Sequence, residues 1–103
     1  MEEEQEDGAP FPVRRSMQAK LEAELQPVEL VIEDQSDQHA GHSGTKGLRS
    51  GETHFAVRVV SDAFDGLNAV KRQRMVYALL ADELAGGVHA LSLVTKTPAE
   101  ASA

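Results

Sequence analysis

Three histidines stand where an imidazole side chain could bind a ligand. His89 follows a Gly-Gly pair and opens an apolar run, so it lies where a predicted strand leaves a turn. Scaffolds often present working groups at such positions, and a neutral imidazole is a common metal ligand. His39 and His42, three residues apart, lie in a glycine-rich stretch. A strand-end histidine bonded to a carbonyl and two solvated loop residues would give the same pattern, so both interpretations stay open.

The chain contains no cysteine, which excludes disulfides, thiol catalysis and a metal site built from its own thiolates. Any metal centre must therefore use imidazole and carboxylate groups, or thiolates that a partner supplies. No Gly-x-Ser-x-Gly motif is present, and no Gly-Lys-Ser/Thr sequence opens a predicted helix. We therefore predict that the protein is not an enzyme.

The formal net charge of −7 argues against a general affinity for nucleic acid or anionic membranes. Residues 2–7 alone carry five acidic side chains. One dense basic group lies in a predicted helix, and it is either a solvated helix face or a surface for an anionic partner: Lys71, Arg72 and Arg74. No apolar run approaches the roughly 18–20 residues of a membrane span, so no membrane association is expected.

Residues 1–12 are acidic and then rich in proline, which predicts a disordered lead-in. A helix should follow from an N-cap at Ser16 to about Leu25, and Pro27 should end it. Apolar residues recur every four positions in this helix and form one stripe: Met17, Leu21 and Leu25.

A second helix is predicted over residues 69–84, with Asn68 as its N-cap. The turn before it should place Phe64 against the core. The glycines at 86 and 87 end the helix. Its expected core-facing residues are Val70, Val76, Leu79, Leu80, Glu83 and Leu84, with Glu83 at the edge.

Three strands are predicted. Residues 28–33 and 52–60 alternate between apolar and polar side chains, whereas the continuous apolar run 88–94 predicts a strand covered on both faces. Residues 34–51 contain four glycines and form a long loop between the first two strands. His54 lies in the second strand and should face away from Phe55, as a structural or surface residue.

The element order is therefore α-β-β-α-β. The first two strands should be antiparallel, and the crossover through the second helix should place the second and third strands parallel. This is an α+β fold, with two helices on one face of a mixed three-stranded sheet. We expect one domain over residues 13–98 and a disordered tail over residues 99–103.

Several motifs, in the same order along the chain, resemble the BolA family, and together the likeness covers roughly residues 15–98. They are Gly51-Glu52-Thr53-His54-Phe55, Val59-Val60-Ser61-Asp62-Ala63-Phe64-Asp65-Gly66, Val70-Lys71-Arg72-Gln73-Arg74-Met75-Val76-Tyr77 and Val88-His89-Ala90-Leu91-Ser92-Leu93. Gln38-His39-Ala40-Gly41-His42 and Lys96-Thr97-Pro98-Ala99-Glu100 are most similar to plant and algal organellar members, including the BolA domain of SufE fusions. The resemblance implies a class II KH-like fold, which agrees with the order derived above.

The resemblance also implies a partner. Members of this family bind monothiol (CGFS-type) glutaredoxins in iron–sulfur cluster trafficking and iron homeostasis. A shared [2Fe–2S] cluster is held there by the glutaredoxin cysteine, a glutathione thiol and ligands of the BolA protein. The family ligand at the start of the last strand corresponds to His89, and the loop ligand to His39, with His42 as the alternative. The isolated chain should hold no cluster; it should be a monomer alone and a heterodimer with glutaredoxin.

A soluble intracellular protein is expected. The resemblance favours the chloroplast or mitochondrion, with the cytosol as the alternative. The alternative function is a KH-like nucleic-acid-binding transcriptional regulator that uses Lys71, Arg72 and Arg74. KH domains clamp nucleic acid with a Gly-x-x-Gly loop, which the turn at residues 64–67 lacks.

Overall fold

The computed structural model describes residues 12–35 and 52–103. Predictions for residues 1–11 and 36–51, including those for His39 and His42, lie outside this part of the chain. The described elements are α1 (Pro12–Leu25), β1 (Glu29–Asp34), β2 (His54–Val60), a 3₁₀ turn η4 (Asp62–Phe64), α2 (Ala69–Leu79), α3 (Ala81–Ala85), β3 (Ala90–Lys96) and α4 (Pro98–Ser102).

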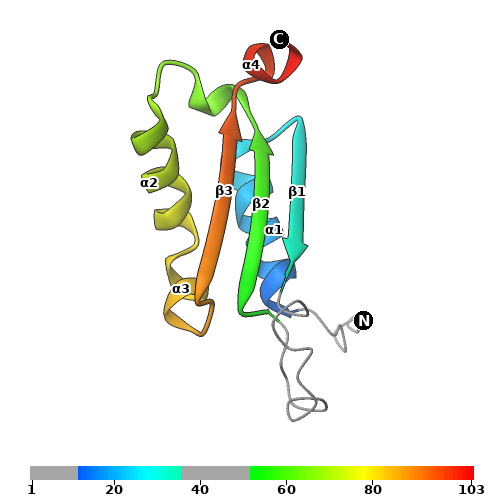
Figure 1. Ribbon diagram of the computed structural model, residues 1–103, viewed down its shortest axis with the longest axis vertical. Helices are drawn as coiled ribbons and strands as arrows, with labels where there is room; N and C mark the ends of the chain where they lie inside the picture. Colours follow the sequence, from blue (N-terminus) through cyan, green and yellow to red (C-terminus); the bar gives the residue numbers. More distant parts are fainter. Residues whose placement is uncertain (1–11, 36–51) are drawn as a thin grey trace.

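The strands form one sheet in the order β1-β2-β3, with β2 in the centre (Figure 1). β1 runs antiparallel to β2, and Glu29 lies opposite Val60. β3 runs parallel to β2, and Ala90 lies opposite His54. These directions confirm the predicted α-β-β-α-β arrangement and the mixed three-stranded sheet.

The core lies between the helices and one face of the sheet. The predicted stripe of α1 is buried, and Phe64 in the 3₁₀ turn is fully buried, as predicted. The opposite face of the sheet is exposed at Val31 and Val94. Helices therefore cover one face, which confirms the predicted layers. The core cluster consists of Met17, Leu21, Leu25, Ile32, Phe55, Val57, Val59, Phe64, Val76, Leu80 and Val88.

The prediction that β3 is covered on both faces is wrong. Ala90, Ser92 and Val94 are exposed, whereas Leu91 and Leu93 between them are half-buried against the core. β3 is an edge strand, and the helices of the described chain lie on one face of the sheet only. The apolar run suggested a strand buried on both faces, but alanine and valine also occupy exposed strand positions.

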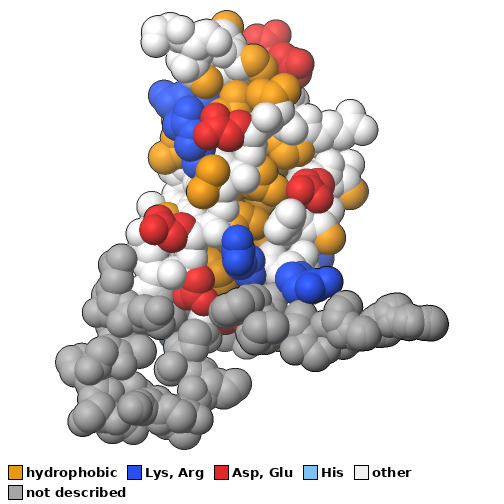
Figure 2. Space-filling view, turned by 90° about the vertical axis from the view of Figure 1, so that its right-hand side faces the viewer, with side chains coloured by type: hydrophobic (Ala, Val, Ile, Leu, Met, Phe, Trp, Pro, Cys, Tyr) orange, Lys and Arg blue, Asp and Glu red, His pale blue; other side chains and the backbone are white. Residues whose placement is uncertain are grey.

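The edge of β3 is covered by side chains of α2. The Tyr77 hydroxyl donates to the carbonyl of Leu91 at 3.2 Å, and Arg72 Nη1 donates to that of Thr95 at 3.1 Å. Exposed strand edges invite pairing with other chains, and these two contacts block part of this edge. β1 forms the other edge; there, Leu30, Val31 and Ile32 line a shallow hollow with Arg14 and Gln18 of α1. Figure 2 shows that side, where hydrophobic side chains lie between charged ones.

The helices differ from the prediction at their ends. α1 begins at Pro12 rather than after Ser16, because a proline in the first turn of a helix gives up no hydrogen bond. The predicted helix 69–84 is two helices, since Leu80 adopts φ −101° and ψ 20° between them. The N-cap at Asn68 is confirmed: its side-chain oxygen accepts from the backbone N–H of Lys71. The expectation that Val70 faces the core is wrong: Val70, in the first turn of α2, is 57% exposed.

Glu83 is a buried carboxylate that joins α3 to α1. It is 8% exposed, accepts a short hydrogen bond from the Ser16 hydroxyl and accepts from Lys20 Nζ at 2.9 Å. Burial acts to raise its pKa, but the hydrogen bonds from Ser16 and Lys20 outweigh burial and lower the pKa. Ser16 is therefore an interior helix residue that holds this carboxylate.

The predicted disordered tail is wrong, because residues 98–102 form the short helix α4. Thr97 and Glu100 make a capping box: the Thr97 hydroxyl accepts from the Glu100 N–H, and the Glu100 carboxylate accepts from the Thr97 N–H. Arg72 holds this carboxylate with two hydrogen bonds, of 2.6 and 3.1 Å. A distant arginine therefore secures a helix too short to be stable alone.

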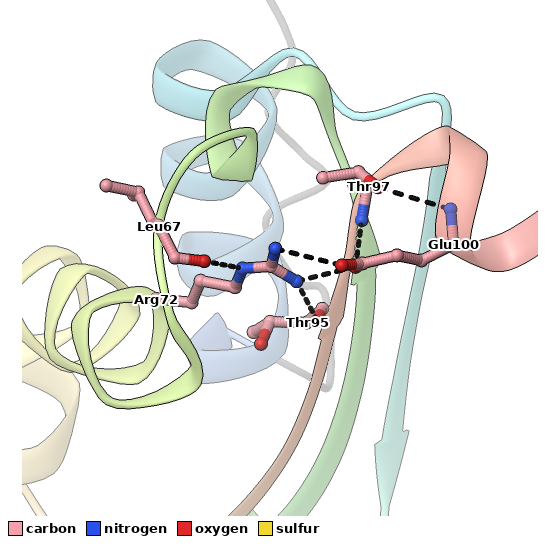
Figure 3. Close-up of polar contacts among 5 residues, drawn as sticks. All are labelled: Leu67, Arg72, Thr95, Thr97 and Glu100. Atoms are coloured by element: carbon pink, nitrogen blue, oxygen red, sulfur yellow. Dashed lines mark hydrogen bonds and ion pairs between the residues drawn. The ribbon is translucent and has the colours of Figure 1, made fainter.

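Arg72 joins three parts of the chain (Figure 3). Its Nε donates to the carbonyl of Leu67 at 2.7 Å, and Nη1 reaches the carbonyl of Thr95 as well as Glu100. The side chain is only 11% exposed. We call these contacts, with those of Thr97 and Glu100, the Arg72 clamp. Arg72 and the Thr97 N–H lower the pKa of Glu100 to about 2.

The clamp predicts that Glu100→Gln lowers the melting temperature at pH 7, because it removes the charge that Arg72 binds. A lowered folded-state pKa means that the stabilisation is complete above the unfolded-state value of 4.5. It is lost as the pH falls toward about 2. The difference between wild type and variant should therefore shrink over this range, measured by thermal unfolding at several pH values.

Glu24→Gln is the matched control, because Glu24 lies on the exposed face of α1. It should leave the melting temperature close to that of wild type at each pH. An equal effect of both variants would contradict the structural role of the clamp.

Candidate functional site at the open end of the sheet

His89 lies at the end of the sheet where β2 and β3 begin. The left-handed φ of +135° at Gly87 lets the chain turn out of α3, and Val88 then enters the core. The N–H of His89 donates to the carbonyl of Thr53 at 2.7 Å, and the N–H of Ala90 donates to the same carbonyl at 3.2 Å. The backbone of His89 is therefore fixed while its side chain is exposed. The predicted position at the start of the last strand is confirmed.

His54 lies beside His89. The two ring centres are 6.2 Å apart, and the ring planes are inclined by 54°. The Thr53 hydroxyl is hydrogen-bonded to Nδ1 of His54 at 2.8 Å. The spacing of the histidines along the chain did not predict this proximity. The available signal was that each begins one of two strands predicted to be parallel, and parallel strands start at the same end of a sheet.

The segment that carries His39 and His42 leaves and re-enters the described chain at this same end. The N–H of Gln35, before the segment, donates to the carbonyl of His54 at 2.7 Å. After the segment, the N–H of Glu52 donates to the Asp34 carboxylate at 3.0 Å. Gln35 and Glu52, which flank residues 36–51, are thus fixed at the end of the sheet where His54 and His89 lie, and neither loop histidine is among the described residues.

Glu52 fixes α1 to this end of the sheet. Its carboxylate accepts from the N–H groups of Val13 and Arg14, both at 3.1 Å. These groups belong to the first turn of α1, where backbone donors lack partners within the helix. A negative charge there also interacts favourably with the helix dipole. Glu52 itself has a left-handed φ of +69°, which is uncommon outside glycine.

The predicted basic group is divided. Lys71 and Arg74 are exposed on α2, whereas the guanidinium of Arg72 belongs to the Arg72 clamp. Two cations of the three therefore face solvent. Arg72 therefore stabilises the fold, and of the predicted basic group only Lys71 and Arg74 could contact an anionic partner.

The site offers imidazoles but no complete metal centre. In the described ranges 12–35 and 52–103, no three His, Asp or Glu side chains gather closely enough to hold a metal ion. An exposed imidazole can give a metal one neutral nitrogen ligand, and the other ligands must then come from elsewhere. Among the same residues, no helix is long and apolar enough to cross a membrane.

Fold and site together define a small α+β domain that presents histidine side chains at one end of its sheet. The chain belongs to the BolA-like protein family, which matches residues 21–100. The family likeness inferred from the motifs is therefore confirmed.

Two curated plant proteins and one solved structure illustrate this membership. Protein BOLA1, chloroplastic, of Arabidopsis thaliana is 62% identical over 84 residues, which are 82% of this chain and 52% of that protein. The solved structure of BolA1 from Arabidopsis thaliana is 60% identical with a TM-score of 0.77, covering 84% of this chain and 92% of the other. SufE-like protein 1, chloroplastic/mitochondrial, of the same plant is 61% identical over 83 residues, 79% of this chain and 22% of that protein.

A bacterial relative is more distant. The DNA-binding transcriptional regulator BolA of Escherichia coli is 42% identical over 85 residues, 82% of this chain and 75% of that protein. This chain spans about half the length of BOLA1 and about a fifth of the length of SufE-like protein 1.

The anchoring role of Glu52 predicts that Glu52→Ala destabilises the fold by about 0.5–2 kcal/mol, the usual range for losing an N-terminal helix cap. The two N–H groups of α1 would lose their common acceptor. Denaturant unfolding, monitored by circular dichroism, measures the change in the free energy of unfolding.

The control is Glu24→Ala, on the exposed face of the same helix. It removes a carboxylate that caps no helix end. If Glu52→Ala were as stable as Glu24→Ala, the capping contact would contribute nothing to stability.

Proposed function

We propose that this protein is the partner of a monothiol (CGFS-type) glutaredoxin and shares a [2Fe–2S] cluster with it through histidine ligands. The observation that carries the proposal is the exposed His89 side chain, fixed by its backbone at the open end of the sheet, on a chain without cysteine. Membership of the BolA-like family supports it, because the histidine occupies the position that the family resemblance assigns to a ligand.

The donor groups of the chain fit a shared cluster. A [2Fe–2S] cluster is commonly held by four thiolates, and two imidazoles replace two of them on one iron in Rieske centres. This chain has four histidines and no thiol, so imidazoles are the groups that it can supply in place of thiolates. The glutaredoxin cysteine and glutathione would supply the thiolates. When bound, the cluster can be transferred as cargo or change its oxidation state.

The chain's own residues hold the ligand in place. Thr53 accepts hydrogen bonds from the backbone on both sides of the His89 Cα, so the side chain leaves a fixed point. The second ligand in this proposal is His39, with His42 as the alternative. Gln35 and Glu52, which flank the segment that carries both, are hydrogen-bonded at the end of the sheet where His89 lies, and this supports a ligand from that segment.

The proposed role is iron–sulfur cluster trafficking and iron homeostasis, without catalysis by this chain. The chain would be a monomer alone, would hold no cluster alone and would form a heterodimer with glutaredoxin. The plant relatives are named as chloroplastic or as chloroplastic/mitochondrial proteins. An organelle is therefore the proposed compartment.

The proposal predicts that His89→Ala abolishes the shared cluster, because one iron loses a ligand. The chain is mixed with a cluster-loaded monothiol glutaredoxin and glutathione, and visible circular dichroism is recorded during the titration. Wild type should give a new spectrum that saturates at one-to-one, and the variant should not. His39→Ala and His42→Ala, compared in the same assay, identify the loop ligand.

His54→Ala is the control, because His54 is not one of the proposed cluster ligands. It should give the wild-type spectrum. The same spectrum from His89→Ala would refute the assignment of His89. A complex seen by size exclusion without any spectral change would instead indicate an adaptor that binds glutaredoxin without a cluster.

The name of the Escherichia coli relative supports a second candidate, nucleic-acid binding. In this chain the surface for it would consist of Lys71 and Arg74, because Arg72 is held by Glu100 and two carbonyls. The net charge of −7 opposes binding to phosphate. This function is therefore less well supported than the cluster partnership.

If nucleic-acid binding does use this helix, Lys71→Ala/Arg74→Ala should weaken it for all sequences. The slope of log affinity against log salt should fall by about two, one for each cation removed. Fluorescence anisotropy with a labelled duplex at several salt concentrations measures both. An unchanged affinity and slope in the double variant would rule out this surface.

A further inference from the structure

We propose that His54 and His89 together form a binding site for a divalent transition-metal ion such as Zn²⁺ on the isolated chain. The inference goes beyond the proposed partnership, because it needs neither glutaredoxin nor the loop histidines. It makes His54 a metal ligand, whereas the shared-cluster proposal gives His54 no role as a ligand.

The first support is the distance between the rings. Their centres are 6.2 Å apart, at an inclination of 54°. Zn²⁺ lies about 2.0–2.1 Å from each imidazole nitrogen that binds it, so at a tetrahedral angle two imidazoles on one ion have their centres roughly 5 Å apart. The observed 6.2 Å is longer by roughly 1 Å, so the two rings must move together by about that amount before both can bind one ion.

The second support is the pairing that keeps the rings together. His54 begins β2, His89 directly precedes β3, and the two strands are in parallel register with His54 opposite Ala90. Neighbouring strands lie about 4.8 Å apart, which fixes the distance between the two backbones. Ligands on paired strands lose less freedom on binding than ligands on two separate loops.

The third support is Thr53, which acts on both histidines. Its carbonyl accepts hydrogen bonds from the N–H groups of His89 and Ala90, and its hydroxyl is hydrogen-bonded to Nδ1 of His54 at 2.8 Å. Metal-binding histidines usually donate their second ring N–H to an oxygen, which fixes the tautomer and orients the ring. When Nδ1–H of His54 donates to Thr53, Nε2 is the nitrogen directed to the ion. Thr53 is thus a positioning residue of the proposed site.

The ligand type selects the class of ion. Two neutral imidazoles favour Zn²⁺, Ni²⁺ or Cu²⁺ over Mg²⁺ or Ca²⁺, which prefer oxygen ligands. The remaining coordination positions would be taken by water, since no third His, Asp or Glu completes a group among the described residues. The ion and the proposed shared cluster would both use His89, so only one of them can be bound at a time.

The test is a calorimetric titration of the full-length chain with Zn²⁺, without any partner. We expect one ion per chain in wild type and in His39→Ala/His42→Ala. The affinity should fall by more than about tenfold in His54→Ala and in His89→Ala. Thr53→Val, which keeps the backbone carbonyl, should weaken binding by about tenfold. In wild type, saturation should shift the ¹⁵N resonance of Nε2 in His54, a change that a purely structural role would not produce.

Three results would overturn the proposal. The first is an affinity for Zn²⁺ in His54→Ala equal to that of wild type. The second is loss of Zn²⁺ binding in His39→Ala/His42→Ala. The third is undiminished Zn²⁺ binding in both His54→Ala and His89→Ala, which would indicate that acidic residues hold the ion. His54→Gln and His89→Gln replace any alanine variant whose circular dichroism shows that it is not folded. Since no glutaredoxin is present, a negative result here leaves the shared-cluster test unaffected.

Discussion

The parallel pairing of β2 with β3 is the constraint on which the rest of this structure depends. Parallel strands start at the same end of a sheet, so after β2 the chain must return along the length of the sheet before β3 can begin. α2 and α3 make this return. This connection places His89 next to His54, and the N–H of His89 donates to the carbonyl of Thr53. The loop between β1 and β2 opens at this end as well, because antiparallel β1 finishes where β2 starts. One topological rule thus places the end of β1, the start of β2 and the start of β3, with His54 and His89, at the same end of the sheet.

Charged residues hold this fold together at the far end of the sheet and on its helical side. At the far end, Arg72 and Glu100 bind each other and several backbone groups, and this clamp closes α4 over the last residues of β3. On the helical side, Glu83 is buried with Ser16 and Lys20. Buried and half-buried charges need such partners, because an unpaired one would be costly to desolvate. These groups therefore stabilise the fold, whereas the side chain of His89 is exposed at the open end, where it can bind a ligand.

Local patterns in the sequence predicted most of the fold. The stripe of α1, the Asn68 cap, buried Phe64 and the direction of each strand follow from spacing, turn chemistry and the handedness of crossovers. Two of the errors, at the start of α1 and in α4, involve contacts between residues far apart in the chain. Glu52 caps α1 from 39 residues away, and Arg72 stabilises α4 from 28 residues away. The proximity of His54 to His89 likewise requires the register of two strands, which the spacing of histidines along the chain does not contain.

Charge gives a physical reason for a cysteine-free ligand set on this chain. The protein has a net charge of −7, and each thiolate that it gave to a cluster or metal ion would add a further negative charge. An imidazole binds as a neutral group, so it contributes a ligand without adding to this repulsion. A complex built from partner thiolates and histidines of this domain, as proposed above, would therefore carry less negative charge than one built from thiolates alone.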